Sequence, residues 1–201
     1  MSYNPYLDNY YSKEAKRQGY RARSVFKLKE IQDKLHIIKK GDIILDLGSA
    51  PGSFIQYLSK IVGPKGFVLG IDIQKIDSIN QKNTHLLQKD IVDIVPSDPD
   101  IIKVLPEKIR SFDVITADLA PMTSGIKDLD HERSIELNRK AFEIATWYLK
   151  PNGTIISKLF EGSDTQAFEQ EIAPNFSILK RYKPKATRKK SKEWYLVAKK
   201  K

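Results

Sequence analysis

Short apolar runs alternate with longer helical patterns along most of the chain. The runs are rich in isoleucine, leucine and valine and are bounded by glycine, proline or aspartate, which is typical of strands buried in a parallel sheet. The predicted strands cover residues 43–45, 66–71, 84–88, 112–117, 153–162, 176–182 and 194–198.

Helical patterns fill the longer intervals between these strands. Apolar residues recur at spacings of three and four over 24–41, 54–61 and 129–149, and shorter helices are expected within 96–106 and from 163 to before Pro174. Strand and helix thus alternate five times before two final strands. This order predicts an α/β fold with a doubly wound, mostly parallel, seven-stranded sheet whose last strand runs antiparallel.

Length and composition narrow the class of protein. With 201 residues, 40% of them hydrophobic, we expect residues 1–201 to form one domain, with a basic arm over about residues 1–24. No run reaches the length of a membrane span and no signal peptide is recognisable, so a cytoplasmic protein is expected. The absence of cysteine excludes disulfides and thiolate metal sites.

Positive charge is concentrated in two segments of a chain whose net charge is +10. Such a charge suggests an acidic partner, most plausibly nucleic acid, although solubility alone is an alternative. The first 24 residues interleave tyrosines with basic residues, including Arg21 and Arg23, and KPKATRKKSKE contains Arg188, Lys189 and Lys190. Both segments can bind phosphates, and the tyrosines can stack on bases; a solvated arm and loop are the alternative.

The stretch IILDLGSAPGSF, residues 43–54, reads as a strand, a tight loop and the start of a helix. Its glycines follow the pattern DxGxxxG and differ from the dinucleotide fingerprint GxGxxG. Asp72 ends the next strand, about 20 residues beyond Gly52, where an acidic residue can bind a ribose diol. These features favour a nucleoside cofactor. Asp90, which follows the third strand, could contact its base or could serve a surface turn.

Several ionisable side chains should meet at the same rim of the sheet. Asp118 and Lys158 come at the carboxyl ends of predicted parallel strands, and Glu193 begins the antiparallel strand at that rim. Lys27 falls at the edge of the apolar stripe of its helix. A purely structural ion pair between Asp118 and Lys158 is the alternative to a catalytic group.

These motifs resemble those of the FtsJ/RrmJ family of S-adenosylmethionine-dependent RNA ribose 2′-O-methyltransferases over nearly the whole chain. DLGSAPGSF is similar to the family loop DLGxAPGGW; FKLKEI, ITADLAP, ISKLFEG and KPKATRKKSKEWYLVA are similar to its other motifs. The resemblance implies a Rossmann-like methyltransferase fold without a metal requirement. It implies a catalytic tetrad of Lys27, Asp118, Lys158 as proton acceptor, and Glu193. It implies cofactor contacts at Gly52, Phe54, Asp72, Asp90 and Asp118.

The resemblance also implies a substrate. The short chain is similar to bacterial members that methylate a uridine in the A-loop of 23S rRNA in the large ribosomal subunit, with Arg21, Arg23, Arg188, Lys189 and Lys190 as RNA-binding residues. Members acting on tRNA anticodon loops share the core, so they stay an alternative, as do an idle RNA-binding relative and a small-molecule methyltransferase. A monomer is expected. Ser53 and Phe54 replace a glycine and a tryptophan of the family loop, and these differences concern the affinity for the cofactor rather than the type of reaction.

Overall fold

The computed structural model describes residues 5–121, 125–188 and 191–201. Its strands are β1 (Ile43–Leu47), β2 (Phe67–Asp72), β3 (Thr84–Gln88), β4 (Phe112–Ala117), β5 (Leu149–Phe160), β6 (Phe176–Tyr182) and β7 (Glu193–Lys200). Its helices are α1 (Pro5–Arg17), α2 (Val25–Leu35), α3 (Ser53–Val62), α4 (Pro99–Val104), α5 (Lys127–Tyr148) and α6 (Thr165–Ile172), with a 3₁₀ turn, η1, at Ile91–Asp93.

The strands form a single seven-stranded sheet in the order β3-β2-β1-β4-β5-β7-β6. The neighbours from β3 to β5 pair in parallel, whereas β7 runs antiparallel to both β5 and β6. The predicted α/β fold with an antiparallel last strand is therefore confirmed. Strand order reverses direction between β1 and β4, and in such sheets ligands bind outside the carboxyl ends at this point.

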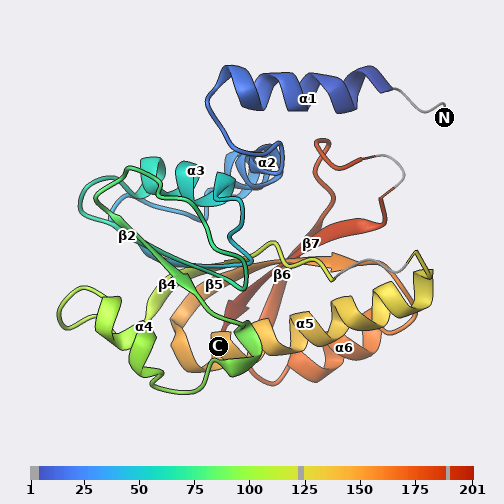
Figure 1. Ribbon diagram of the computed structural model, residues 1–201. Coiled ribbons are helices and arrows are strands. Elements are labelled where there is room, and N and C mark those ends of the chain that lie inside the picture. Colours follow the sequence, from blue (N-terminus) through green and yellow to red (C-terminus); the bar gives the residue numbers. More distant parts are fainter. Residues whose placement is uncertain (1–4, 122–124, 189–190) are drawn as a thin grey trace.

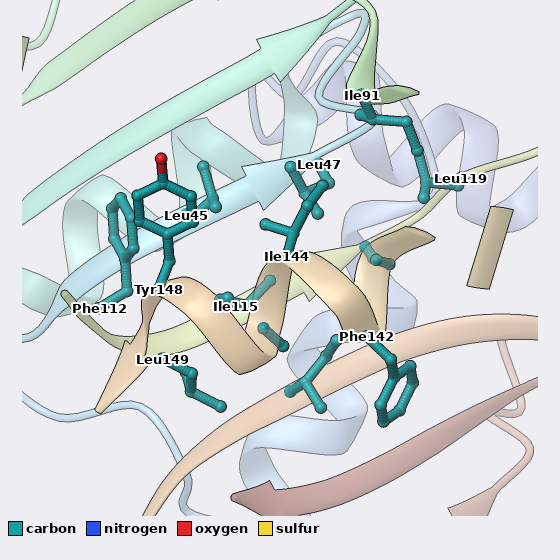
Figure 2. Packing of buried hydrophobic residues seen from close by; sticks show 14 of the residues in the cluster. Leu45, Leu47, Ile91, Phe112, Ile115, Leu119, Phe142, Ile144, Tyr148 and Leu149 are labelled. Carbon is teal, nitrogen blue, oxygen red and sulfur yellow. The ribbon is translucent and has the colours of Figure 1, made fainter. Parts of the chain in front are cut away.

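Helices cover both faces of the sheet (Figure 1), because successive strand residues point to opposite sides. Leu45 and Ile115 belong to the cluster of buried residues on the α5 side, and Figure 2 shows them with Ile144 of that helix. Ile44 and Val114, their neighbours in sequence, belong to the cluster that includes α2 and α3 residues. Packing from both sides fixes the carboxyl rim in place.

The predicted basic arm of about residues 1–24 contains a helix that the sequence analysis does not predict, because residues 5–17 form α1. Among the side chains described for residues 10–17, Ala15 is buried, and the rings of Tyr11 and Phe26 lie 5.5 Å apart. These two positions are a single turn apart, which is too short a periodicity to recognise in the sequence. Figure 1 shows α1 lying over α2, outside the helix layer that covers the sheet.

The strict alternation of strand and helix was also wrong at one crossover. Residues 73–83, which join β2 to the parallel strand β3, contain no helix. The segment instead lies along the rim as a loop, so its backbone carbonyls are available to other side chains. Within the described residues, no helix has the length and apolar character needed to cross a bilayer.

Candidate functional site

A cleft of about 600 Å³ opens at the carboxyl rim, at the point where strand order reverses. Its volume suits a nucleoside-sized ligand. The segments that follow β1, β2, β3 and β4 form its walls. The lining residues include Gly48, Ala50, Pro51, Asp72, Ile76, Asp77, Asp90, Asp118 and Leu119.

Asp72 ties two of these walls together. One carboxylate oxygen, Oδ2, accepts a hydrogen bond from the Ala50 amide at 2.8 Å, and Oδ1 accepts one from the Gln74 amide at 2.8 Å. Asp90 caps η1 by accepting a hydrogen bond from the Val92 amide at 3.1 Å. Each oxygen keeps further acceptor capacity, so both carboxylates in the cleft can still bind ligand hydroxyl or amino groups.

Gly52 and Phe54 do not line the cleft, although the sequence predicts cofactor contacts for both. Phe54 is 4% exposed and belongs to the core cluster under α3. The backbone of Gly52 has φ of 105°, and an added Cβ would lie 2.7 Å from Ile79 Cδ1. Glycine here therefore leaves room for the chain's own side chains, and a ligand contact at either residue stays a prediction.

Two lysine–carboxylate pairs stand beside the cleft. Lys158 Nζ lies 3.2 Å from Asp118 Oδ1 and donates a hydrogen bond to the Asp118 carbonyl oxygen at 3.0 Å. Lys27 Nζ lies 2.6 Å from Glu193 Oε1. The structure thus brings the four predicted tetrad residues to one rim, from α2, the end of β4, β5 and the start of β7.

The two lysines keep Asp118 ionised. Burial alone would raise the pKa of this carboxyl, but the positive charges of Lys158 and Lys27 outweigh it. Hydrogen bonds from Tyr195 and Lys158 act in the same direction, so the pKa lies below its ordinary value. Asp118 is therefore a fixed negative charge at neutral pH and does not itself accept a proton.

Tyr195 is a site residue that the sequence analysis missed. Its hydroxyl donates a hydrogen bond to Asp118 Oδ1 at 2.7 Å, and its ring is fully buried. Burial and the nearby charges of Asp118 and Glu193 raise its pKa well above the ordinary value, so the phenol keeps its proton. The available signal was the alternation in EWYLVA, which places residues 193 and 195 on the same face of the strand.

The strand that carries Lys158 is anchored from α5. The Asn138 side-chain amide donates hydrogen bonds to the Lys158 carbonyl at 2.8 Å and to the Ser134 carbonyl at 2.8 Å. Its Oδ1 accepts a hydrogen bond from the Ser157 hydroxyl at 2.6 Å. This network fixes the β5 backbone at Lys158, while Asp118 holds Nζ itself.

Asp46, at the end of β1, was also missed. It is fully buried, Oδ1 accepts a hydrogen bond from the Thr116 hydroxyl at 2.6 Å, and Oδ2 accepts none from any described residue. Burial, together with the charges of Asp118 and Asp72, raises its pKa to about 7. The carboxylates that line the cleft itself, among them Asp72, Asp90 and Asp118, fit a ligand that carries both hydroxyl groups and positive charge.

A second, smaller cleft continues from the tetrad into basic surface. Arg23, Lys27, Arg188 and Glu193 are among its lining residues. Arg23 Nη2 donates a hydrogen bond to the Ala186 carbonyl at 2.9 Å, and the Lys185 amide donates one to Glu30 on α2 at 2.7 Å. The basic loop between β6 and β7 is therefore held against the domain; Figure 1 shows it beside α2.

Of the remaining predicted RNA-binding residues, Lys189 and Lys190 lie outside the described residues, and Arg21 does not line this cleft. The side chain of Arg21 points to the loops that wall the first cleft and donates hydrogen bonds to their carbonyl oxygens. Among the described residues, no group of three His, Asp or Glu side chains is arranged to hold a metal ion.

Residues 20–201 match the model of the FtsJ-like methyltransferases. A ribosomal RNA large subunit methyltransferase E from Syntrophobacter fumaroxidans is 40% identical over 197 residues, which are 98% of this chain and 96% of that protein. The protein of the same name from Bdellovibrio bacteriovorus is 40% identical over 199 residues, 98% of this chain and 97% of that one.

Solved structures are similar over the same region. A putative ribosomal RNA methyltransferase from Plasmodium falciparum has a TM-score of 0.78 and 30% identity, covering 90% of this chain and 98% of that one. Fibrillarin from Aeropyrum pernix, solved with S-adenosylmethionine bound, has a TM-score of 0.61 and 17% identity, covering 89% of this chain and 75% of that chain. The latter likeness is one of fold.

Proposed function

The chain belongs to the FtsJ-like methyltransferase family, and from this membership we propose that it methylates a ribose 2′-hydroxyl of ribosomal RNA with S-adenosylmethionine as donor. One observation carries the proposal. The Lys158–Asp118 pair links two clefts: Asp118 lines the acidic cleft, and Lys27, whose positive charge acts on Asp118, lines the basic cleft together with Glu193. A methyl donor on one side and an RNA strand on the other would meet at the Lys158 amine.

The acidic cleft supplies what the cofactor requires. When bound, S-adenosylmethionine supplies a methyl group on a positively charged sulfonium. Asp72 would accept hydrogen bonds from its ribose, and Asp90 would accept one from its base. The negative charge of Asp118 favours a cationic ligand at this end of the cleft.

Lys158 is proposed to take the proton of the ribose hydroxyl. The attacking oxygen must lose that proton as it becomes a nucleophile, and a nearby base contributes roughly 10²- to 10⁴-fold to such a step. Nζ is anchored on Asp118 at 3.2 Å and on its carbonyl at 3.0 Å, so a neutral amine keeps a lone pair to receive the proton. Asp118 then stabilises the ammonium that forms.

Lys27 and Glu193 are proposed to position the acceptor ribose. Their ion pair, 2.6 Å long, lies in the basic cleft and leaves the Lys27 ammonium two further protons to donate. The positive charge of Lys27 also acts on Asp118. In-line placement of the hydroxyl lowers the barrier by removing orientational entropy, independently of proton transfer.

The relatives from Syntrophobacter and Bdellovibrio are named for the large subunit of ribosomal RNA. Since this chain covers nearly their full length at 40% identity, we propose the same substrate class, and within it a uridine in the A-loop of 23S rRNA. We further propose that residues 1–201 act as one catalytic domain, monomeric and cytoplasmic. Gel filtration with light scattering tests the monomer.

The deciding experiment transfers labelled methyl from S-adenosylmethionine to unmodified large ribosomal subunits, free 23S rRNA and tRNA. We expect label on a ribose of the subunit RNA, and mapping of the modified nucleotide tests the A-loop uridine. Label on tRNA alone would keep the chemistry and move the substrate to the anticodon loop. No label on RNA despite cofactor binding would favour an idle RNA-binding protein or a small-molecule enzyme.

Removing the three charges at Arg188, Lys189 and Lys190 is expected to weaken RNA binding. If each contacts a phosphate of single-stranded RNA, the slope of log K against log salt should flatten by about 2, since each contact contributes about 0.7. Fluorescence anisotropy over a salt series measures both effects. The matched control neutralises Lys103, Lys108 and Arg110, three exposed cations before β4, at the opposite rim. If the slope of log K against log salt were equal for the two triple variants, the basic segment would be a solvated loop that does not contact RNA.

A further inference from the structure

Arg21 holds two loops of the acidic cleft with one guanidinium. Nη1 donates hydrogen bonds to the carbonyl oxygens of Pro51 at 3.0 Å and Asp77 at 2.7 Å, and Nη2 donates one to the Ser78 carbonyl at 2.7 Å. Pro51 belongs to the loop after β1, whereas Asp77 and Ser78 belong to the loop after β2. The side chain therefore bridges segments that are separate in sequence.

Both bridged loops form the walls of the cleft. Pro51 and Asp77 line it directly, as does Ile76. The bridge also lies close to the glycine of the loop, since a Cβ on Gly52 would stand 3.0 Å from Arg21 Nη1. The loop after β2 contains no helix; Asn83 fastens its far end to α3, whereas the Arg21 bridge and the Asp72 hydrogen bonds connect it to the loop after β1.

The backbone of Arg21 is itself fastened to α3. Its amide donates a hydrogen bond to Gln56 Oε1 at 2.9 Å, and Gln56 Nε2 donates one to the Gly19 carbonyl at 2.9 Å. Tyr20, between them, is buried in the core. The Arg21 backbone is therefore anchored, and its planar guanidinium donates hydrogen bonds to carbonyls on two loops at once. The ammonium of a lysine cannot reproduce this geometry.

We propose that Arg21 is a positioning residue for the cofactor, which sets the width of the acidic cleft by clamping its two loops. This role differs from the RNA contact that the sequence predicts for Arg21. It rests on the proposed function, because it takes S-adenosylmethionine as the ligand of the cleft. Arg23, two residues later, instead lines the basic cleft and serves as the natural contrast.

Isothermal titration with S-adenosylmethionine, in the absence of RNA, tests the clamp. Arg21→Ala should weaken binding roughly tenfold, since charge-assisted hydrogen bonds that order the site are lost. Arg21→Lys should recover only part of the loss. The matched control Arg23→Ala removes the same charge two residues away and should leave cofactor affinity unchanged while it weakens RNA binding.

Kinetics separate positioning from a general loss of structure. For Arg21→Ala we expect a raised KM for S-adenosylmethionine, kcat at saturating cofactor within a few-fold, and an unchanged salt slope of RNA binding. A global defect would lower kcat and the melting temperature of Arg21→Ala and Arg21→Lys alike, and would overturn the clamp. So would unchanged cofactor affinity with weaker RNA binding, which would return Arg21 to the RNA surface. If the unsubstituted protein bound no S-adenosylmethionine, the proposed function itself would fail.

Discussion

Replacing Lys158 with alanine is expected to lower methyl transfer by roughly 10³-fold, while the affinity for S-adenosylmethionine stays within a few-fold. The substitution removes the proposed proton acceptor, which lies beside Asp118. Asp118, which lines the acidic cleft, keeps the Tyr195 hydroxyl as a donor at 2.7 Å, so the cofactor side of the site is retained. Labelled-methyl transfer and titration calorimetry measure the two quantities.

Two further variants distinguish the role of Lys158 as a proton acceptor from the effect of its positive charge. Lys158→Arg keeps a cation beside Asp118 but cannot act as a base at neutral pH, so it should be as inactive as Lys158→Ala. Lys150→Ala removes a lysine that pairs with Asp113 at the other end of β5, and should leave activity unchanged. Near-normal turnover of Lys158→Arg would assign the residue an electrostatic role and exclude it as the base.

The Lys158 substitution should also destabilise the fold. Breaking a buried ion pair from one side typically costs about 3–5 kcal/mol, because the remaining charge is left buried. Lys27 and Tyr195 still act on Asp118, so we expect a loss toward the lower end of this range. Activity is therefore compared well below the melting temperature of the least stable variant.

Asp46 should make the free energy of unfolding depend on pH. Burial raises the pKa of its carboxyl from 3.8 to about 7, so the folded protein binds a proton more tightly than the unfolded chain does. The resulting stabilisation is complete below about pH 4 and is lost as pH rises through about 7. A shift of this size corresponds to about 4 kcal/mol between the two limits.

Asp46→Asn removes this titration and nearly preserves the shape of the side chain. Urea unfolding of both proteins without cofactor, from pH 4 to pH 8, gives the difference in their free energies of unfolding. That difference should move by about 4 kcal/mol in favour of the variant toward high pH, since all other titrations cancel. Parallel curves for the two proteins would show that Asp46 is ionised throughout or protonated throughout.

The spacing of apolar residues, and the glycine, proline and aspartate residues that bound each run, were enough to predict the strands of the sheet. The short apolar runs and the helical spacings between them predicted the strands and the antiparallel end, because burial on two faces leaves a local signature in each element. The rim positions of Asp72, Asp118, Lys158 and Glu193 followed from the same order. The helix α1 left no comparable pattern.

The tertiary structure decided how those residues are used. Lys158 pairs with Asp118 and Lys27 with Glu193, and Arg21 turns from the expected RNA surface to two carbonyl-bearing loops. A sequence can show which side chains lie at the carboxyl rim of the sheet, since the spacing of apolar residues indicates where each strand ends and which face of each helix is buried. Which donor meets which acceptor depends on the packing of loops far apart in sequence, and that is set only when the whole chain folds.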